Sequence, residues 1–557
     1  MKKFLAILLT FCMCAAVLVA CNEDTNLPDQ TDAQTEKQTD APGTDAPNTD
    51  APGTDAPGTD APGTEAPDTD APGTGEDDKP TQTLIEIGSV EAWNELAAAG
   101  DPDGKDFEGK TVKLTSNLNF ASTSAITLFD TFKGTFDGSG FTIGGTSVVK
   151  LNKKNGATIA GSALIAEELI GATVKNVSIT GFTIIPPADM NTENCGVVAQ
   201  KVTGTTASTI EGVTVRNVKV DTEFMMSNKA DVGAIVGLVS LSSVNVKNCK
   251  ITDFTVVTSG GKMNVHGVAG VVGFLSATGM STFENIEAKL DLAGRNGAVG
   301  GVIGWMNASD NQSGFKINKV TVTGIVSAPG NSGGSAAVGG ILGQLRDTSA
   351  AGPCEVKNTV VDAKVFCTAN SGHAGGIAGK FGKDNGQTGG TLTIENCYVA
   401  GEVSCVKGGS NKNRTSALLG EFGCADGALT VKNVIIAVAL EQTSVDSDAT
   451  IVPDVTVTNT SWSNNQLVVR HMNGKVKNEA GESVAIVPTL SNIWITITKS
   501  TRDATGAAIK DDTTGALVPT DITHTEAFTV IAKADIASKI TYDANGFIES
   551  IAAPTAA

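Results

Sequence analysis

The sequence predicts an all-β protein built mainly as a parallel β-solenoid, and two recurring phrases carry this prediction. The first phrase is Gly-x-x-Gly with apolar residues between the glycines, as in Gly270-Val-Val-Gly273 and Gly340-Ile-Leu-Gly343. The second is an apolar residue, a charged residue and asparagine, as in Val-Lys-Asn248. Copies recur 31 to 41 residues apart, and a period in this range is typical of stacked repeats.

Each asparagine of the second phrase is expected to mark a corner between two short strands. Strand alternation puts Val246 and Asn248 on one face, yet the apolar Cys249 follows directly and must also face inward. Asparagine tolerates the left-handed backbone that such a bend requires. Stacked corners lie about 4.8 Å apart, so their amides can hydrogen-bond along the stack. The expected corner residues are Asn176, Asn217, Asn248, Asn285, Asn358, Asn396 and Asn433.

One copy is out of register. Near Asn318 the asparagine comes one residue early relative to the inward columns. The columns fit best if Lys319 takes the corner, and we expect a bulge there. Coils of this length must also carry loops, and any ligand specificity is expected in those loops or on the sheet face beside them.

The Gly-x-x-Gly phrase, with a long hydrophobic residue between its glycines, resembles the GLUG motif of bacterial surface proteins that have a pectin-lyase-like right-handed parallel β-helix. The resemblance covers roughly residues 84–441 and rests on many copies in register. It implies a right-handed coil and a cell-surface setting. It implies no activity, because the motif carries no catalytic residue.

Residues 1–20 are expected to be an export signal. Lys2-Lys3 is a basic start, and the apolar run from Phe4 to Val17 is too short for a stable transmembrane helix. Leu18-Val-Ala-Cys21 resembles the lipobox of bacterial lipoproteins. By that resemblance, cleavage leaves Cys21 as the lipidated first residue of an extracytoplasmic protein held to a membrane at the bacterial cell surface. The alternative is an ordinary secretory signal with a chance cysteine.

Residues 21–80 are expected to form a disordered linker behind the lipidated cysteine. Seven consecutive Thr-(Asp/Glu)-Ala-Pro-x pentads run from Thr39 to Gly73, with almost no hydrophobic side chain to bury. From Asn22 onward the segment holds 16 acidic and 2 basic residues, so it carries most of the chain's net charge of −20. The acidity is therefore mainly a property of a spacer and does not indicate an acidic binding face.

Residues 81–441 are assigned to the β-helix and 442–557 to a C-terminal β cap or small β domain. A helix from Ser89 to Gly100 is expected to cap the first coil, because Ser89 can serve as N-cap and Gly100 as C-cap. A solenoid needs such a cap because its end exposes hydrophobic side chains. Near the C-terminus, Asn545-Gly546 predicts the turn of a β-hairpin.

Two cysteines are expected to lie close together. Cys367 and Cys405 each stand nine residues after their corner asparagine on adjacent coils, which brings their backbones within disulfide range. The alternative is a pair of stacked buried thiols. Seven cysteines follow Cys21, and none forms a Cys-x-x-Cys motif or has a histidine at metal-ligand spacing. No metal or other cofactor is therefore expected.

His373 and Arg414 are weak candidates for a ligand groove, because each lies six residues before the closing glycine of its repeat. The alternative is that they are ordinary surface polar residues. No catalytic residue is assigned. Acidic residues beside the corners are isolated among lysines, which is typical of a solvated face rather than of paired catalytic carboxylates.

These features favour a non-catalytic binding or adhesion module on the cell surface, with an extracellular glycan or a surface protein as ligand. One alternative is a polysaccharide lyase or glycoside hydrolase on the same scaffold, and another is a structural surface rod. Aromatic residues make up only 4% of the chain, which disfavours the enzyme. The chain has no basic patch for nucleic acid, and we expect a monomer.

Overall fold

The computed structural model describes residues 83–554 except 121–125, 146–147, 151–162, 186–192, 223–229, 258–264, 296, 309–312, 330–334, 348–350, 370, 383–386, 389, 406–413, 426, 443–467, 473–474, 478–479, 481 and 497–527. The chain divides into two units, residues 1–77 and 78–557, and all described residues belong to the second. The expected export signal, Cys21 and the expected linker lie outside the described residues.

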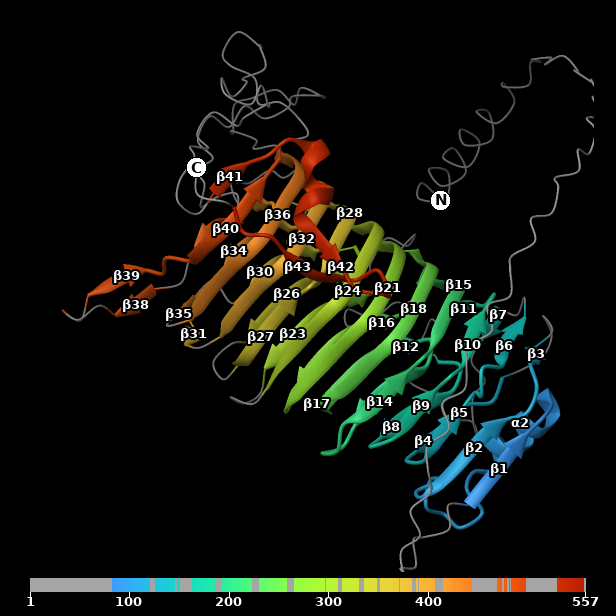
Figure 1. The fold of residues 1–557 in the computed structure, drawn as a ribbon. Coiled ribbons are helices and arrows are strands. Elements are labelled where there is room, and N and C mark those ends of the chain that lie inside the picture. Colours follow the sequence, from blue (N-terminus) through green and yellow to red (C-terminus); the bar gives the residue numbers. More distant parts are fainter. Residues whose placement is uncertain are drawn as a thin grey trace, which may run out of the picture. The chain divides into compact units, whose positions relative to one another are not determined.

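The described chain is a parallel β-solenoid, as predicted (Figure 1). Three parallel sheets form its walls, and the chain visits them in the same order in each of the middle coils. The short sheet contains β12 (Glu193–Gly196), β16 (Ala230–Gly233), β19 (Val265–Ala269), β22 (Ala298–Gly300), β25 (Ser335–Gly339), β29 (Ser371–Gly375) and β33 (Arg414–Ser416).

The Gly-x-x-Gly phrase then leads into the middle sheet. It contains β4 (Phe129–Phe132), β8 (Ala166–Ile170), β13 (Ala199–Thr203), β17 (Val236–Ser242), β20 (Val272–Ala277), β23 (Ile303–Ala308), β26 (Leu342–Asp347), β30 (Ala378–Phe381), β34 (Leu419–Phe422) and β37 (Val469–Met472).

The third wall is the corner sheet, whose longer strands run through the asparagine corners. It contains β1 (Thr83–Ile87), β2 (Lys110–Leu114), β3 (Leu118–Phe120), β5 (Thr135–Asp137), β6 (Thr142–Gly145), β7 (Val148–Lys150), β9 (Thr173–Lys175), β10 (Ser178–Thr180), β11 (Thr183–Ile185), β14 (Ser208–Glu211), β15 (Thr214–Asp221), β18 (Val244–Val257), β21 (Met280–Ala293), β24 (Ser313–Ala328), β27 (Ala351–Lys357), β28 (Val360–Cys367), β32 (Thr391–Cys405), β36 (Ala428–Gln442), β40 (Thr489–Ile495) and β41 (Phe528–Val530).

Three two-stranded pairings and two helical segments complete the described structure. β31 (Gln387–Thr388) pairs in parallel with β35 (Cys424–Ala425). The antiparallel pairs are β38 (Lys475–Lys477) with β39 (Ser483–Ala485), and β42 (Ile540–Tyr542) with β43 (Ile548–Ile551). The helical segments are α2 (Val90–Ala99) and the 3-10 helix η1 (Lys533–Lys539).

The helix α2 lies at the N-terminal end of the solenoid, where a cap was expected (Figure 1). Ser89 accepts a hydrogen bond from the amide of Ala92, and Gly100 ends the helix with a φ of 72°. Trp93 is fully buried, and its ring centroid lies 5.2 Å from that of Phe129. The helix therefore covers the aromatic end of the core with its own apolar face.

All seven predicted corner asparagines adopt the left-handed backbone, with φ between 50° and 55°. Six of them lie in one column, in which the Nδ2 of a corner donates to a side chain of the preceding coil, to Oδ1 where that residue is asparagine. The Nδ2–Oδ1 distances are 3.0 Å for Asn285 to Asn248, 2.8 Å for Asn358 to Asn318, 3.1 Å for Asn396 to Asn358, 3.1 Å for Asn433 to Asn396 and 2.9 Å for Asn492 to Asn433. Asn176 and Asn248 donate instead to the carboxylates of Asp137 and Glu211. The corners are thus tied across coils by side chains as well as by the backbone.

The prediction for Asn217 was wrong in its column. Asn217 lies in register between Gly181 and Asp253, and Gly212, with a φ of 62°, takes the corner of the ladder on that coil.

The irregular copy keeps its register without the bulge that we expected. Lys319 takes the corner with a φ of 55°, and β21 pairs with β24 in register on both sides of it. Asn318 remains in the ladder one position earlier, because it accepts from Asn358 and donates to Glu284. The sequence inversion therefore exchanges two side chains and leaves the backbone path unchanged.

The solenoid continues beyond residue 441, where we expected its register to end. β40 pairs in parallel with β36, and Asn492 within it is a further left-handed corner. β41 pairs in parallel with β40, and β37 extends the middle sheet. Asn492 comes 59 residues after Asn433, and this wider spacing, which includes residues 443–467, hides the repeat in the sequence.

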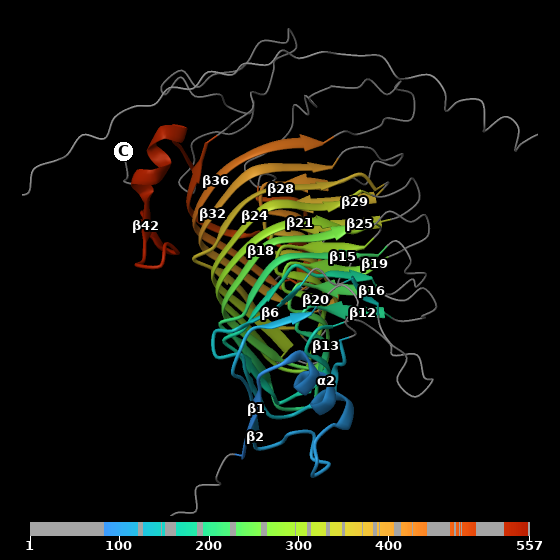
Figure 2. The same cartoon turned by 90° about the vertical axis from the view of Figure 1, so that its right-hand side faces the viewer.

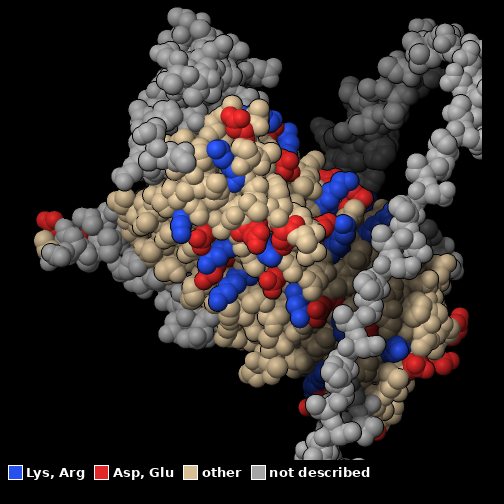
Figure 3. Space-filling view, in the orientation of Figure 1, with Lys and Arg blue, Asp and Glu red and all other residues tan. Residues whose placement is uncertain are grey.

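The position before each corner forms a second ladder, whose charge alternates along the corner sheet. In register it reads Lys113, Asp137, Lys175, Glu211, Lys247, Glu284, Asn318, Lys357, Glu395, Lys432. Ion pairs join neighbours, for example Lys247 to Glu211 at 3.1 Å. Figure 3 shows acidic and basic side chains mixed on the molecule's surface. If a coil paired with the next but one instead of with its neighbour, like charges would face each other. The ladder therefore favours the native order of the coils.

Candidate functional site

The outward face of the corner sheet changes character along the solenoid just after the corners. One outward column reads, in register, Thr214, Lys250, Glu287, Thr321, Val360, Tyr398, Ile435, Trp494. Its first half is polar and its second half is apolar. An apolar outward column needs a cover, because it would otherwise leave a hydrophobic surface in water.

The C-terminal segment supplies that cover. Ile536 of η1, together with Ile540, Ile548 and Ile551 of the hairpin, packs with Trp494 and its outward neighbours in one buried cluster. The indole of Trp494 donates to the carbonyl of Ala552 at 2.7 Å. Figure 2 shows β42 beside β32 and β36, outside the corner sheet. The C-terminal hairpin is thus seated on the solenoid that it follows.

The hairpin reaches back to the irregular copy. The ammonium of Lys319 lies 2.8 Å from the carboxylate of Asp543, whose other oxygen accepts from the amides of Asn545 and Phe547 at 2.9 and 3.1 Å. The lysine lowers the pKa of Asp543, and the carboxylate raises the pKa of Lys319. The swapped Asn318-Lys319 pair therefore places a cation where the hairpin tip needs one.

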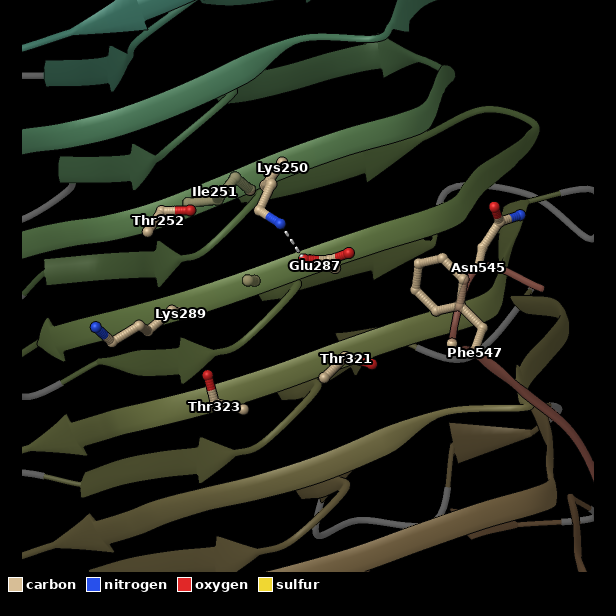
Figure 4. Close-up of a pocket in the computed structure, with 11 residues that line it drawn as sticks. Lys250, Ile251, Thr252, Glu287, Lys289, Thr321, Thr323, Asn545 and Phe547 are labelled. Atoms are coloured by element: carbon tan, nitrogen blue, oxygen red, sulfur yellow. Dashed lines mark hydrogen bonds and ion pairs between the residues drawn. The ribbon is translucent and has the colours of Figure 1, made fainter. Parts of the chain in front are cut away.

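A cavity of 360 Å³ lies between the hairpin tip and the polar half of the face (Figure 4). Its floor comes from outward side chains of β18, β21 and β24, and one wall comes from the hairpin turn. The lining residues are Lys250, Ile251, Thr252, Glu287, Ala288, Lys289, Thr321, Thr323, Asn545, Gly546 and Phe547. This volume falls within the range of small-molecule sites in proteins.

The charges in the cavity are paired. Lys250 lies 2.6 Å from Glu287, and Lys289 lies 2.7 Å from Asp253 at the edge. The threonine hydroxyls can both donate and accept hydrogen bonds. The cavity therefore offers a neutral, hydrogen-bonding surface beside the ring of Phe547, which suits an uncharged polar ligand better than an ion.

Lys319→Ala should loosen the hairpin. Because pairing lowers the pKa of Asp543, the contribution of this pair is fully present above the ordinary aspartate pKa of about 4 and is lost as the pH falls through the lowered value. Hydrogen–deuterium exchange should show faster exchange of residues 540–551 in the variant at neutral pH. Lys247→Ala, which removes an ion pair elsewhere on the same sheet, should leave this exchange unchanged. Equal protection of the hairpin in both variants would contradict the role of Lys319.

The structure places the predicted groove residues together but not in an open groove. His373 and Arg414 pair in register on the short sheet, and both contact the carboxylate of Glu421 on β34. Lys380 lies 3.7 Å from the same carboxylate. Glu421 is fully buried and His373 is 6% exposed. This buried cluster links side chains of the short sheet to a side chain of the middle sheet. Glu421 was not identified from the sequence, because it lies seven residues after Arg414 and on a different sheet.

The two predicted cysteines also lie together. Cys367 and Cys405 are register partners on β28 and β32, both are fully buried, and their Sγ atoms are 2.8 Å apart as thiols. Contact with Cys367 and burial raise the pKa of the Cys405 thiol. A disulfide between them stays a prediction.

The described part of the chain holds no group of three or more His, Cys, Asp or Glu residues arranged to bind a metal ion. Within it, no helix has the length and apolar character needed to cross a bilayer.

No family model, no curated protein and no solved structure matches this chain.

Proposed function

We propose that this chain is a lipid-anchored bacterial surface protein of the GLUG-motif kind, and that its solenoid is a binding or adhesion module for an extracellular glycan. The lipobox-like sequence ending at Cys21 supports the anchor, and the acidic pentad repeats support a spacer between the membrane and the solenoid. The observation that carries the binding role is the 360 Å³ cavity beside the hairpin.

The chemistry of the cavity favours a sugar as ligand. A sugar ring presents neighbouring hydroxyls, each of which needs both a donor and an acceptor. Thr321 and Thr323 stand two residues apart on one strand and supply such groups, while the Lys250–Glu287 pair supplies a donor beside an acceptor. The ring of Phe547 adds an apolar wall against which a sugar's C–H groups can pack.

The same contacts favour binding over hydrolysis. Glycoside hydrolysis uses two carboxyl groups that flank the scissile bond, one of them held protonated. Among the residues that line the cavity, Glu287 alone carries a carboxyl group, and Asp253 stands at the edge; each is engaged by a lysine, at 2.6 and 2.7 Å. The lining therefore supplies no pair of carboxyl groups to flank a glycosidic bond.

A glycan array tests this proposal, with a reducing-end assay on the same polysaccharides. The probe is the exported chain carrying Cys21→Ser, so that no lipid is attached. We expect saturable binding to a restricted set of glycans and no new reducing ends. New reducing ends would contradict the proposal in favour of a glycoside hydrolase or lyase. Absence of both binding and cleavage would also contradict it, and would leave a structural rod.

A further inference from the structure

The middle sheet carries an apolar patch on its outward face that the glycan proposal does not use. Leu238, Phe274 and Trp305 are register neighbours on β17, β20 and β23, and all three are half-buried. Toward the N-terminal end the same column continues with Lys201 and Glu168, which form an ion pair at 3.2 Å. The column thus turns from charged to apolar on three successive coils.

Leu241 presents a further exposed hydrophobic side chain on the same strand, three residues after Leu238. Its φ is 48°, a left-handed conformation that disfavours leucine, and the pairing of β17 with β20 shifts register between Ser240 and Ser242. The side chain is 60% exposed. A bulge of this kind re-aims a side chain, and backbone strain with no gain in burial is a feature of functional surfaces.

Arg346 completes the patch. Its guanidinium carbon lies 5.5 Å from the centroid of the Trp305 ring, and the side chain is exposed. Phe274 meets the same ring at 6.4 Å with an interplanar angle of 61°. The indole N–H donates to Asn307 at 3.1 Å, so the ring is held in place. The arginine therefore lies beside the aromatic pair with an exposed side chain that a partner's acceptor can reach.

From these contacts we infer that the patch is a docking surface for a protein segment that presents a carboxylate next to an aliphatic or aromatic side chain. Tryptophan and arginine dominate the energetic centres of protein interfaces, and apolar residues with few lysines or acids surround them. Charge complementarity selects the carboxylate, because a guanidinium bound over an aromatic ring pairs with carboxylates in a fixed geometry. A sugar fits less well, because Arg346 occupies one face of the indole and Phe274 is tilted against it.

A peptide library displayed on phage, selected against the whole exported chain, tests this inference. We expect enriched peptides to contain Asp or Glu beside a large apolar residue. Arg346→Glu should weaken their binding on the order of tenfold, whereas Arg216→Glu, at an exposed arginine on the corner sheet, should not change it. The cavity variant Thr321→Val should also leave it unchanged, which separates this surface from the proposed glycan site.

Leu241→Asn gives a readout that a purely structural role would not. Asparagine tolerates the left-handed backbone, so the variant should unfold at a higher temperature while it binds the selected peptides less tightly. Leu84→Asn, at a leucine that is 53% exposed elsewhere, should leave peptide binding unchanged. Peptides that bind all variants alike, or a selection that enriches no acidic-apolar sequence, would overturn the inference.

Discussion

Gly343→Ala, at the closing glycine of the Gly-x-x-Gly phrase, is expected to keep the solenoid from folding stably. A Cβ atom at this position would lie 2.4 Å from the carbonyl oxygen of Gly304 and 2.5 Å from the amide nitrogen of Val299 on the preceding coil. Both are backbone atoms, so no side chain can move aside. We expect a loss above about 3 kcal/mol in the free energy of unfolding, measured by circular dichroism during chemical and thermal unfolding.

Gly279→Ala is the matched control for this prediction. A Cβ atom there would meet nothing closer than the hydroxyl of Ser243 at 3.7 Å. The control should change the free energy of unfolding by less than about 0.5 kcal/mol. If both variants unfold alike, the Gly-x-x-Gly phrase does not serve the close approach of coils. The motif would then need another explanation.

Asn396→Leu is expected to destabilise the solenoid by about 3 kcal/mol. Asn396 has a φ of 53°, donates to Asn358 and accepts from Asn433, with both hydrogen bonds at 3.1 Å. A left-handed leucine costs about 1–2 kcal/mol, and each lost hydrogen bond costs about 1 kcal/mol. The shift in the denaturant midpoint measures the sum.

Asn396→Gly separates the two contributions. Glycine adopts the left-handed backbone without strain but forms no side-chain ladder. It should therefore cost clearly less than leucine. A glycine variant as unstable as the leucine variant would show that the corner depends on the amide ladder and not on its backbone conformation.

The solenoid itself could be predicted because its signals are local and repeated. A corner asparagine and two glycines recur within each coil, and each has a conformational reason to be there. The charge ladder was visible only as mixed signs, because its alternation depends on the register between coils of unequal length. Lys113 to Lys432 form a ladder only once that register is known.

The candidate site could not be predicted for a related reason. Its wall depends on a contact between Lys319 and Asp543, which are 224 residues apart. The seat of the hairpin depends on Val360, Tyr398, Ile435 and Trp494 falling in one outward column. Read singly, each is an ordinary strand residue. The hairpin at Asn545-Gly546 was predicted, but nothing in its sequence says where it packs.

The most direct test of the proposed binding site is a calorimetric titration of a glycan selected on the array. Thr321→Val with Thr323→Val removes two hydroxyls from the cavity and keeps β-branched side chains in the strand. We predict a loss of affinity on the order of tenfold, as expected when hydrogen bonds to a ligand are removed. Thr430→Val, on β36 and outside the cavity lining, should bind like the unaltered chain. Equal affinity in all three proteins would contradict the assignment of this cavity as the glycan site.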